Sequence, residues 1–354
     1  MNRDIHFLEA KKLLMELIRI PSISKEEESA ADFLERHIAM KGIESGRLGN
    51  NIWCFSPSFD IDKPTILLNS HIDTVKPVTG WTLDPFIPLE KEGKLYGLGS
   101  NDAGASLVAL FEVFQLLTKA EQHYNLIYLA SCEEEISGEN GIASVLPQLP
   151  PIHFALVGEP TQMQPAIAEK GLMVLDVMVK GKSGHAARNE GVNAIYKAIK
   201  DIAWFKDYRF DKKSEVLGDV KMTVTQIEAG TQHNVVPDTC TFVVDIRSNG
   251  LYSNQEILEI ISNNISAKAT PRSTRLNASH LPNDHFFIQR AKSLGLIPFG
   301  SPTLSDQSQM DFPSVKIGPG NSARSHTANE YINLMELAEA IPLYYQLLNG
   351  LNIR

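Results

Sequence analysis

The hydrophobic pattern of the chain predicts three strands that are buried on both faces. Residues 65–70, 126–131 and 154–157 are short, mostly apolar runs, and each leads into histidine or acidic residues. Continuous apolar runs of this length suit the strands of a parallel sheet, in which helices cover both faces. Residues 103–119 are apolar at helical spacing, and Asn101-Asp102 in front of them is the expected helix cap. Strand and helix alternate, which indicates an α/β domain with a parallel sheet.

Polar signatures stand at the end of each predicted strand. They read His71-Ile72-Asp73, Glu133-Glu134-Glu135 and Gly158-Glu159-Pro160, and Asn101-Asp102 and His326 complete the set. Each signature alone has an ordinary explanation as a core or surface pair, a solvated acidic face or a turn. Ligands of open α/β sheets bind outside the carboxyl ends of the strands, where these side chains would converge. Their joint occurrence in this order is typical of a site for two metal ions.

Beyond about residue 171 the pattern changes to that of a smaller α+β module. Residues 172–180 alternate between apolar and polar positions, as in a half-buried strand. The following segments predict a helix, two strands and a second helix: 193–205, 222–227, 240–246 and 255–265. The order strand-helix-strand-strand-helix-strand is typical of a module with an antiparallel sheet. We place this module, which contains no metal signature, at residues 172–278.

Composition and charge agree with a globular protein of two domains. The chain has 354 residues, of which 43% are hydrophobic and 21% are charged, ordinary values for a soluble protein. A net charge of -9 argues against a nucleic-acid partner or an anionic membrane, since both attract basic surfaces. The three cysteines form no Cys-x-x-Cys pair, so we expect reduced thiols in a cytoplasm. Residues 7–20 predict an amphipathic helix and neither a signal peptide nor a membrane span.

Seven segments that span nearly the whole chain carry a family resemblance: 17–22, 70–75, 81–86, 93–102, 132–135, 157–161 and 326–330. They resemble the zinc-dependent amidohydrolases and exopeptidases, the family of acetylornithine deacetylase, succinyl-diaminopimelate desuccinylase, aminoacylase and the glutamate-releasing carboxypeptidases. The resemblance implies a discontinuous catalytic domain at 1–171 and 279–354, with a mixed sheet and helices on both faces. It also implies that residues 172–278 form an inserted lid through which the protein makes a homodimer.

The resemblance implies a metal-binding role for five residues. His71 and Glu159 would bind one ion, Glu135 and His326 would bind the other, and Asp102 would bridge the two. The family resemblance implies two zinc ions per subunit. Mixed nitrogen and oxygen ligands without thiolate also suit cobalt or manganese as replacements.

Two further acidic residues would complete the chemistry. Asp73 would accept a hydrogen bond from the ligand histidine of its own signature and fix the tautomer. Glu134 would be the general base, which takes a proton from water that zinc has acidified to a pKa of about 7. A second register stays open, with Glu133 as base and Glu134 as ligand; we prefer Glu134 and Glu135, because the triplet then aligns whole with the family's Asp-Glu-Glu. Ala103-Gly104 also departs from the family, which has Met-Lys-Gly after the bridging aspartate.

Candidate substrate contacts also follow from the resemblance. His185 would stabilise the oxyanion across the dimer, Asn234 would orient the substrate, and Arg247 would hold its α-carboxylate. Without their flanking motifs, these three would be an ordinary loop histidine, turn asparagine and surface arginine. Loops where the family lines its substrate pocket add three more candidates: Ser305, Asp306 and Gly320.

The expected activity is removal of an acyl group from the α-nitrogen of an amino acid, with N2-acetylornithine in arginine biosynthesis as the first candidate. Residues 81–86 and 158–161 are more similar to acetylornithine deacetylases than to desuccinylases. N-acetyl- or N-succinyl-citrulline or ornithine and N-succinyl-diaminopimelate are alternative substrates, since few pocket contacts would distinguish them. A metallo-dipeptidase or aminopeptidase and a non-catalytic binding protein are the other classes. The presence of every expected ligand and of the base argues against the last.

Overall fold

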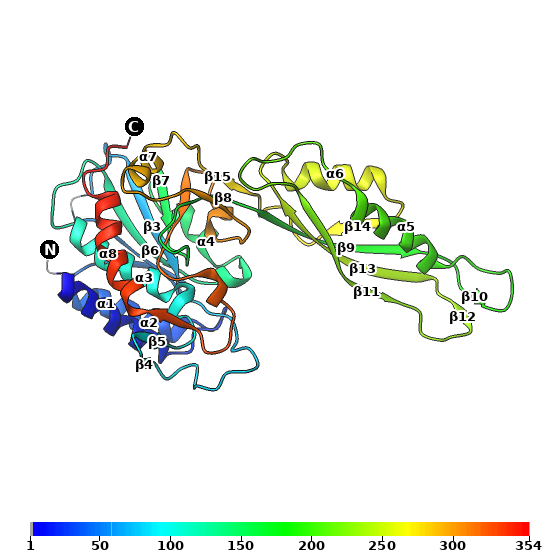
Figure 1. Cartoon of the computed structure of the whole chain (residues 1–354), viewed down its shortest axis with the longest axis horizontal. Coiled ribbons are helices and arrows are strands. Elements are labelled where there is room, and N and C mark those ends of the chain that lie inside the picture. Colours follow the sequence, from blue (N-terminus) through cyan, green and yellow to red (C-terminus); the bar gives the residue numbers. More distant parts are fainter. Residues whose placement is uncertain (1–2, 58, 354) are drawn as a thin grey trace. The chain divides into compact units, whose positions relative to one another are not determined.

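The computed structural model describes residues 3–57 and 59–353, and the chain divides into two compact units (Figure 1). The first unit comprises Met1–Ile167, Leu281–Phe299 and Ser305–Arg354. The second comprises Ala168–His280 and the short segment Gly300–Leu304. The sequence predicted the smaller module as one continuous segment, 172–278. In the structure, the second unit consists of two segments that are separate in sequence.

Most strands of a nine-stranded mixed sheet belong to the first unit, in the order β1-β2-β6-β3-β7-β17-β8-β15, with β16 paired to β8. β3 is parallel to both β6 and β7, and every residue of these three strands is buried, as their apolar runs predicted. β2 and β8 pair antiparallel with their neighbours, which confirms an α/β fold with a mixed sheet. The strands are β1 (Ser45–Leu48), β2 (Asn51–Phe55), β3 (Thr65–His71), β6 (Asn125–Ser131), β7 (Phe154–Val157), β8 (Ala166–Glu169), β15 (Ser279–His280), β16 (Phe299–Ser301) and β17 (Ser314–Lys316).

Helices pack on both faces of this sheet. Successive side chains of β6 point to opposite faces, and their contacts show which helix covers each face. The ring of Tyr128 lies 5.1 Å from that of Phe111 and 6.2 Å from that of Phe114, both in α3. Its neighbours Ile127 and Leu129 pack with residues of α4 instead. The helices are α1 (Arg3–Ile18), α2 (Glu28–Met40), α3 (Ala105–Leu117), α4 (Ile142–Val145), α7 (Phe286–Ser293) and α8 (Leu334–Leu348). None of the helices in the described part of the chain has the length and apolar run that a bilayer crossing requires.

The expected cap of α3 by Asn101 and Asp102 is wrong. α3 begins at Ala105 with Gly104 as its N-cap, and Ser100–Gly104 forms a separate turn, η1. The backbone N–H groups of Asn101 and Asp102 donate instead to the carboxylate of Glu330, at 2.8 and 2.9 Å. A partner so distant in sequence leaves no trace in the local pattern from which the cap was predicted.

A small three-stranded sheet, of order β18-β5-β4, explains how Glu330 reaches this turn. β18 pairs antiparallel with β5, so Glu330, which precedes β18, lies beside the residues that follow β5. The strands are β4 (Leu89–Lys91), β5 (Lys94–Tyr96) and β18 (Tyr331–Asn333). Short 3-10 turns complete the unit: η2 (Glu134–Ile136), η3 (Leu146–Gln148), η4 (Asp306–Gln309) and η5 (Ser322–Arg324).

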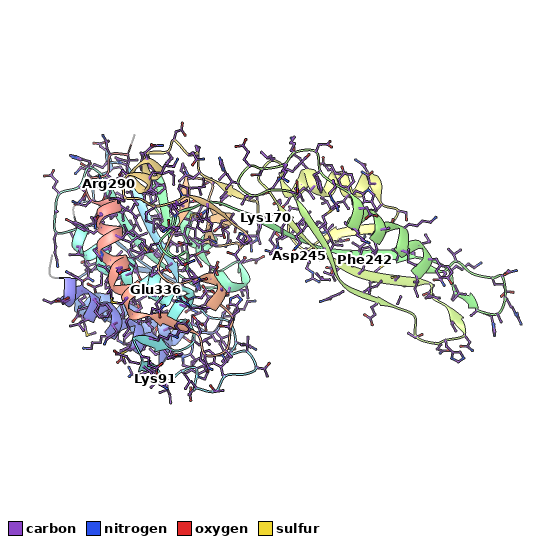
Figure 2. All side chains as sticks on the ribbon, in the orientation of Figure 1. Lys91, Lys170, Phe242, Asp245, Arg290 and Glu336 are labelled. Atoms are coloured by element: carbon purple, nitrogen blue, oxygen red, sulfur yellow. The ribbon has the colours of Figure 1, made fainter. Side chains whose placement is uncertain are left out.

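The predicted strands and helices of the second unit occur in the expected order, and two short strands that were not predicted, β10 and β12, lie between them. Its four-stranded sheet runs β11-β13-β9-β14 and is antiparallel throughout. Alternate residues of β9 and β13, including Phe242 (Figure 2), point to one face, where α5 and α6 cover them. The elements are β9 (Gly171–Lys180), β10 (Gly184–His185), α5 (Ala194–Asp207), β11 (Lys221–Ala229), β12 (Val235–Val236), β13 (Thr239–Ser248), α6 (Asn254–Asn264) and β14 (Lys268–Pro271).

Candidate metal centre

The carboxyl ends of three parallel strands bring the predicted ligands together. His71 is the last residue of β3, and Glu159 comes shortly after β7. Glu134 and Glu135 lie in η2, soon after β6. Because β3 pairs in parallel with both neighbours, these ends lie at one edge of the sheet. His326 follows η5 with a left-handed φ of 57°, a strained conformation for a non-glycine residue that is concentrated at functional sites.

The imidazole of His71 is surrounded by carboxylates at distances typical of ligands that share a metal ion. Its Nε2 lies 3.4 Å from Oδ1 of Asp102, 3.7 Å from Oε1 of Glu159 and 3.9 Å from Oε2 of Glu134. Two ligands of a tetrahedral zinc ion are about 3.4 Å apart when each lies about 2.1 Å from the metal. Nε2 is buried and makes no hydrogen bond with any residue in 3–57 and 59–353. A metal ion at this place would supply its partner.

A second group of ligand atoms gathers around His326. Its Nε2 lies 2.8 Å from Oε2 of Glu135 and 3.7 Å from Oδ2 of Asp102. Asp102 thus presents one carboxylate oxygen to each histidine, since its Oδ1 faces His71. The ligand atoms of His71, Asp102 and Glu135 all lie within 4.8 Å of one another. These residues fit a pair of metal ions with a shared carboxylate, and nitrogen and oxygen ligands without thiolate suit zinc, cobalt or manganese.

The crowded carboxylates shift each other's pKa values. Burial and the charge of Glu159 raise the pKa of Glu134 well above its ordinary value. Burial also raises the pKa of Glu135, and the hydrogen bond with Glu135 raises the pKa of His326 to about 9. Burial opposes protonation of His71, but the charge of Glu134 and the other carboxylates around it raise its pKa well above the usual range. Protons and metal ions therefore compete for this centre, since either kind of cation relieves the repulsion.

Asp73 connects His71 to the loop of the acidic triplet. Nδ1 of His71 lies 2.9 Å from the backbone oxygen of Asp73 and 3.5 Å from its Oδ1. The carboxylate accepts the backbone N–H groups of Glu134 and Glu135, at 3.1 and 3.2 Å, and the hydroxyl of Ser24 at 2.7 Å. We expected the carboxylate to be the partner of His71, but the carbonyl is nearer because the carboxylate is turned toward the triplet. Asp73 therefore orients a histidine and two glutamates at once.

Glu133 points away from this centre. Its Oε1 accepts a hydrogen bond from Nδ2 of Asn140 at 3.0 Å, and its backbone N–H donates to Glu27. Glu134 and Glu135 are the members of the triplet that face the histidines. The geometry favours the register with Glu134 as base and Glu135 as ligand.

Two expected substrate contacts of the first unit are buried. Oδ2 of Asp306 accepts the hydroxyl of Ser131 at 2.6 Å, at the end of β6, and burial raises the pKa of Asp306 to about 6. Ser305 is also buried, and its hydroxyl caps η4. Asp306 therefore supports the strand end and Ser305 the turn, and their predicted contact with a substrate stays a prediction. Gly320 has a φ of +88°, and a Cβ there would lie 2.4 Å from Oδ1 of Asn101.

The second unit holds the three other expected contacts. His185 lies in β10, and the N–H of the next residue, Ala186, donates to the backbone oxygen of Asn234 at 3.0 Å. His185 and Asn234 are both exposed. Arg247 lies in β13, and its Nε and Nη2 donate to the carboxylate of Asp245 (Figure 2) at 2.8 and 3.0 Å. Their roles toward a substrate stay predictions.

Known proteins of related sequence are amide hydrolases. Residues 67–350 match the model of peptidase family M20/M25/M40. Acetylornithine deacetylase of Proteus mirabilis is 28% identical over 309 residues, which cover 80% of this chain and 79% of that protein. Succinyl-diaminopimelate desuccinylase of Buchnera aphidicola is 28% identical over 271 residues, which cover 71% of each chain.

Solved structures show the same fold. Aminopeptidase PepT from Bacillus cereus has a TM-score of 0.78 with this structure at 20% identity, over 98% of both chains. The Bacillus subtilis protein YXEP, described as a dinuclear metal binding peptidase, has a TM-score of 0.73 at 18% identity, again over 98% of both chains. The sequence match over most of the chain, together with this fold, shows that the protein belongs to peptidase family M20/M25/M40 and is an amide hydrolase of that family.

Proposed function

We propose that the protein is a dinuclear zinc hydrolase that removes an acyl group from the α-nitrogen of an amino acid. One observation carries this proposal: Asp102 presents one carboxylate oxygen to His71 and the other to His326. Unpaired charges in a protein interior are costly, so a buried cluster of carboxylates needs compensating cations. Two divalent ions provide that compensation and a reason for the shared carboxylate.

Five residues would hold the two ions. His71 and Glu159 would bind one, His326 and Glu135 the other, with Asp102 between them. When bound, zinc supplies Lewis-acid polarisation of the amide carbonyl and makes water acidic enough to serve as the nucleophile at neutral pH. Cobalt or manganese would serve as replacements.

Glu134 would move the proton in this reaction. Its Oε2 lies 3.9 Å from Nε2 of His71, so the carboxylate faces the centre where the attacking water would be held. It takes a proton from the attacking water and returns it to the amine nitrogen as the C–N bond breaks. The water oxygen forms the new C–O bond, so the products are a carboxylate and a free amine. His185 would stabilise the negative charge on the carbonyl oxygen during this step.

Among acylated amino acids, we propose N2-acetylornithine as the substrate, with ornithine and acetate as products in arginine biosynthesis. The name of the Proteus mirabilis relative supports this choice. Arg247 would bind the α-carboxylate with its guanidinium fork, and Asn234 would orient the substrate. Because Asp245 already accepts two N–H groups of Arg247, the substrate carboxylate would have to share or replace that pair.

The decisive experiment measures amine release by the zinc-loaded protein from a panel of substrates. The panel contains N2-acetylornithine, N2-succinylornithine, N-acetylcitrulline, N-succinyl-diaminopimelate and simple dipeptides, each with metal-stripped protein as the control. Zinc-dependent preference for N2-acetylornithine supports the proposal. Preference for another acyl amino acid changes the substrate, and dipeptide cleavage makes the protein a peptidase. If neither the zinc-loaded nor the metal-stripped protein releases amine, the proposed enzyme activity is refuted and a non-catalytic binding protein is the remaining class.

We also propose a cytoplasmic homodimer that forms through the second unit. Tyr196 and Ile199 of α5 are 70% and 55% exposed, and Ile227 of the edge strand β11 is 59% exposed. An edge strand with apolar neighbours can pair with a second copy of itself. Light scattering tests the dimer: Ile199→Lys should shift it toward monomer, and a monomeric unmodified protein would refute it. The buried, disulfide-free cysteines support a reducing compartment.

A further inference from the structure

Glu330 is a buried carboxylate that lies between two segments of the metal centre. The residue is 2% exposed, and it follows His326 by four positions. Its Oε1 accepts the backbone N–H groups of Asn101 and Asp102 at 2.8 and 2.9 Å, and its Oε2 accepts that of Gly99 at 3.0 Å.

The three hydrogen bonds add to those of the turn itself, in which the N–H of Ser100 donates to the backbone oxygen of Gly97 and that of Gly104 to Gly99. Asp102 has φ -119° and ψ 98°, so its backbone is not helical, although it lies just before α3. Backbone N–H groups that converge on one anion form a nest, which is a strong site for a carboxylate. The backbone oxygen of Glu330 adds a fourth contact, since it accepts the N–H of Gly97 at 3.0 Å.

We infer that Glu330 is a positioning residue that directs the carboxylate of Asp102 toward both histidines. Its main chain continues the segment that carries His326, and its side chain binds the backbone of Asp102, so it fixes one ligand relative to the other. The oxygen-to-nitrogen distances of 3.4 and 3.7 Å from Asp102 to the two histidines depend on this alignment. The inference rests on the proposed function, because it takes Asp102 and His326 as metal ligands.

Glu330→Gln changes this contact with little change in shape. One side-chain oxygen can still accept the N–H groups of Asn101 and Asp102, but an amide NH2 then faces the N–H of Gly99, and two donors repel. Substitution of a residue that orients a metal ligand typically lowers metal affinity by about 10- to 100-fold. We expect zinc to bind to Glu330→Gln about 10- to 100-fold more weakly than to the unmodified protein.

The experiment uses the full-length protein and zinc alone as the probe. Zinc affinity is measured by competition with a chromophoric chelator, and the visible absorption of the cobalt-loaded protein reports ligand geometry. Asp201→Asn is the matched control, because Asp201 is a buried carboxylate of the second unit that accepts the backbone N–H groups of Ser266 and Ala267, both at 3.1 Å. It should leave zinc affinity and the cobalt spectrum unchanged. Glu330→Asp, which keeps the charge but is shorter, should fold and bind zinc with intermediate affinity.

The outcomes separate this inference from the proposed function. If the unmodified protein binds no zinc, the metal centre is refuted, and the role of Glu330 falls with it. If it binds zinc and Glu330→Gln shows the same affinity and cobalt spectrum, only the role of Glu330 is refuted. If neither Glu330 variant folds while Asp201→Asn does, Glu330 is a stability determinant and its assignment as a positioning residue is overturned.

Discussion

Replacing Glu134 by glutamine should separate catalysis from metal binding. Glutamine keeps the shape of the side chain but cannot accept a proton from water. A general base typically contributes about 100- to 10,000-fold to the rate, so we expect kcat to fall by at least about 100-fold. The ligands His71, Asp102 and Glu135 are untouched, so two zinc ions should stay bound.

The same substitution should stabilise the protein after its metal has been removed. The ligand atoms of Glu134 and Glu159 lie within 4.8 Å of each other. Two like charges at that separation repel by about 3.5 kcal/mol at an effective dielectric constant of about 20. Burial and this repulsion hold the pKa of Glu134 well above 4.5, so its contribution to stability is lost as the pH rises from 4.5 through the raised pKa. Because glutamine cannot ionise, the variant should match the unmodified protein near pH 4.5 and be more stable at about pH 8, where loss of the repulsion alone contributes up to about 3.5 kcal/mol.

Three measurements decide this prediction: kcat with zinc, bound zinc by elemental analysis, and urea unfolding of chelated protein at about pH 5 and about pH 8. Glu133→Gln is the matched control, because its side chain bonds to Asn140 and not to the histidines. That control should keep kcat within about tenfold of the unmodified protein. Near-normal kcat in Glu134→Gln would refute its role as base. Equal losses in both variants would reopen the register of the triplet, and lower stability of metal-free Glu134→Gln at the higher pH would refute the electrostatic argument.

Three further predictions concern other parts of the protein. His185→Ala should lower kcat by at least about tenfold with unchanged zinc content, and unaltered kinetics would remove His185 from the reaction. Chelation should lower the melting temperature, and zinc at about 100 times its Kd should restore about 2.7 kcal/mol; no shift on zinc addition would contradict a metal centre. Gly320→Ala should destabilise the protein by about 1–3 kcal/mol in urea, because of its positive φ and the oxygen of Asn101 at 2.4 Å. Gly42→Ala, with φ +74° and nothing within 4 Å of the added Cβ, should cost less; equal losses would show that the contact with Asn101 is unimportant.

Elements with a strong local pattern were predicted correctly. β3, β6 and β7 are apolar and buried along their whole lengths, so their sequences alone indicate central strands. β9 alternates in burial over most of its length, as a strand with one covered face should. Each of these patterns shows which face of the strand is buried, and it can be recognised from residues that are neighbours in sequence.

The candidate ligands were named from the family resemblance, and their residue types, histidine and carboxylates, suit a metal ion. His71 and Glu159 follow or end strands whose carboxyl ends meet, so the topology alone predicts that they converge. The structure brings every predicted ligand into this cluster. The strand pattern does not predict the direction of each side chain. That direction decides which residue can act as base, which as metal ligand and which as a supporting hydrogen-bond partner.

Long-range contacts decided those directions. The false cap at Asn101 and Asp102, the turned carboxylate of Asp73 and the burial of Asp306 all depend on partners in other segments. Glu330, 228 residues after Asp102 in sequence, is the clearest case, because its segment approaches η1 only when β18 pairs with β5. Periodicity therefore predicts the strands, and the motifs of the family resemblance predict the ligand set. The orientation of the site is a property of the assembled fold, since the hydrogen bonds that fix it form only when distant segments meet.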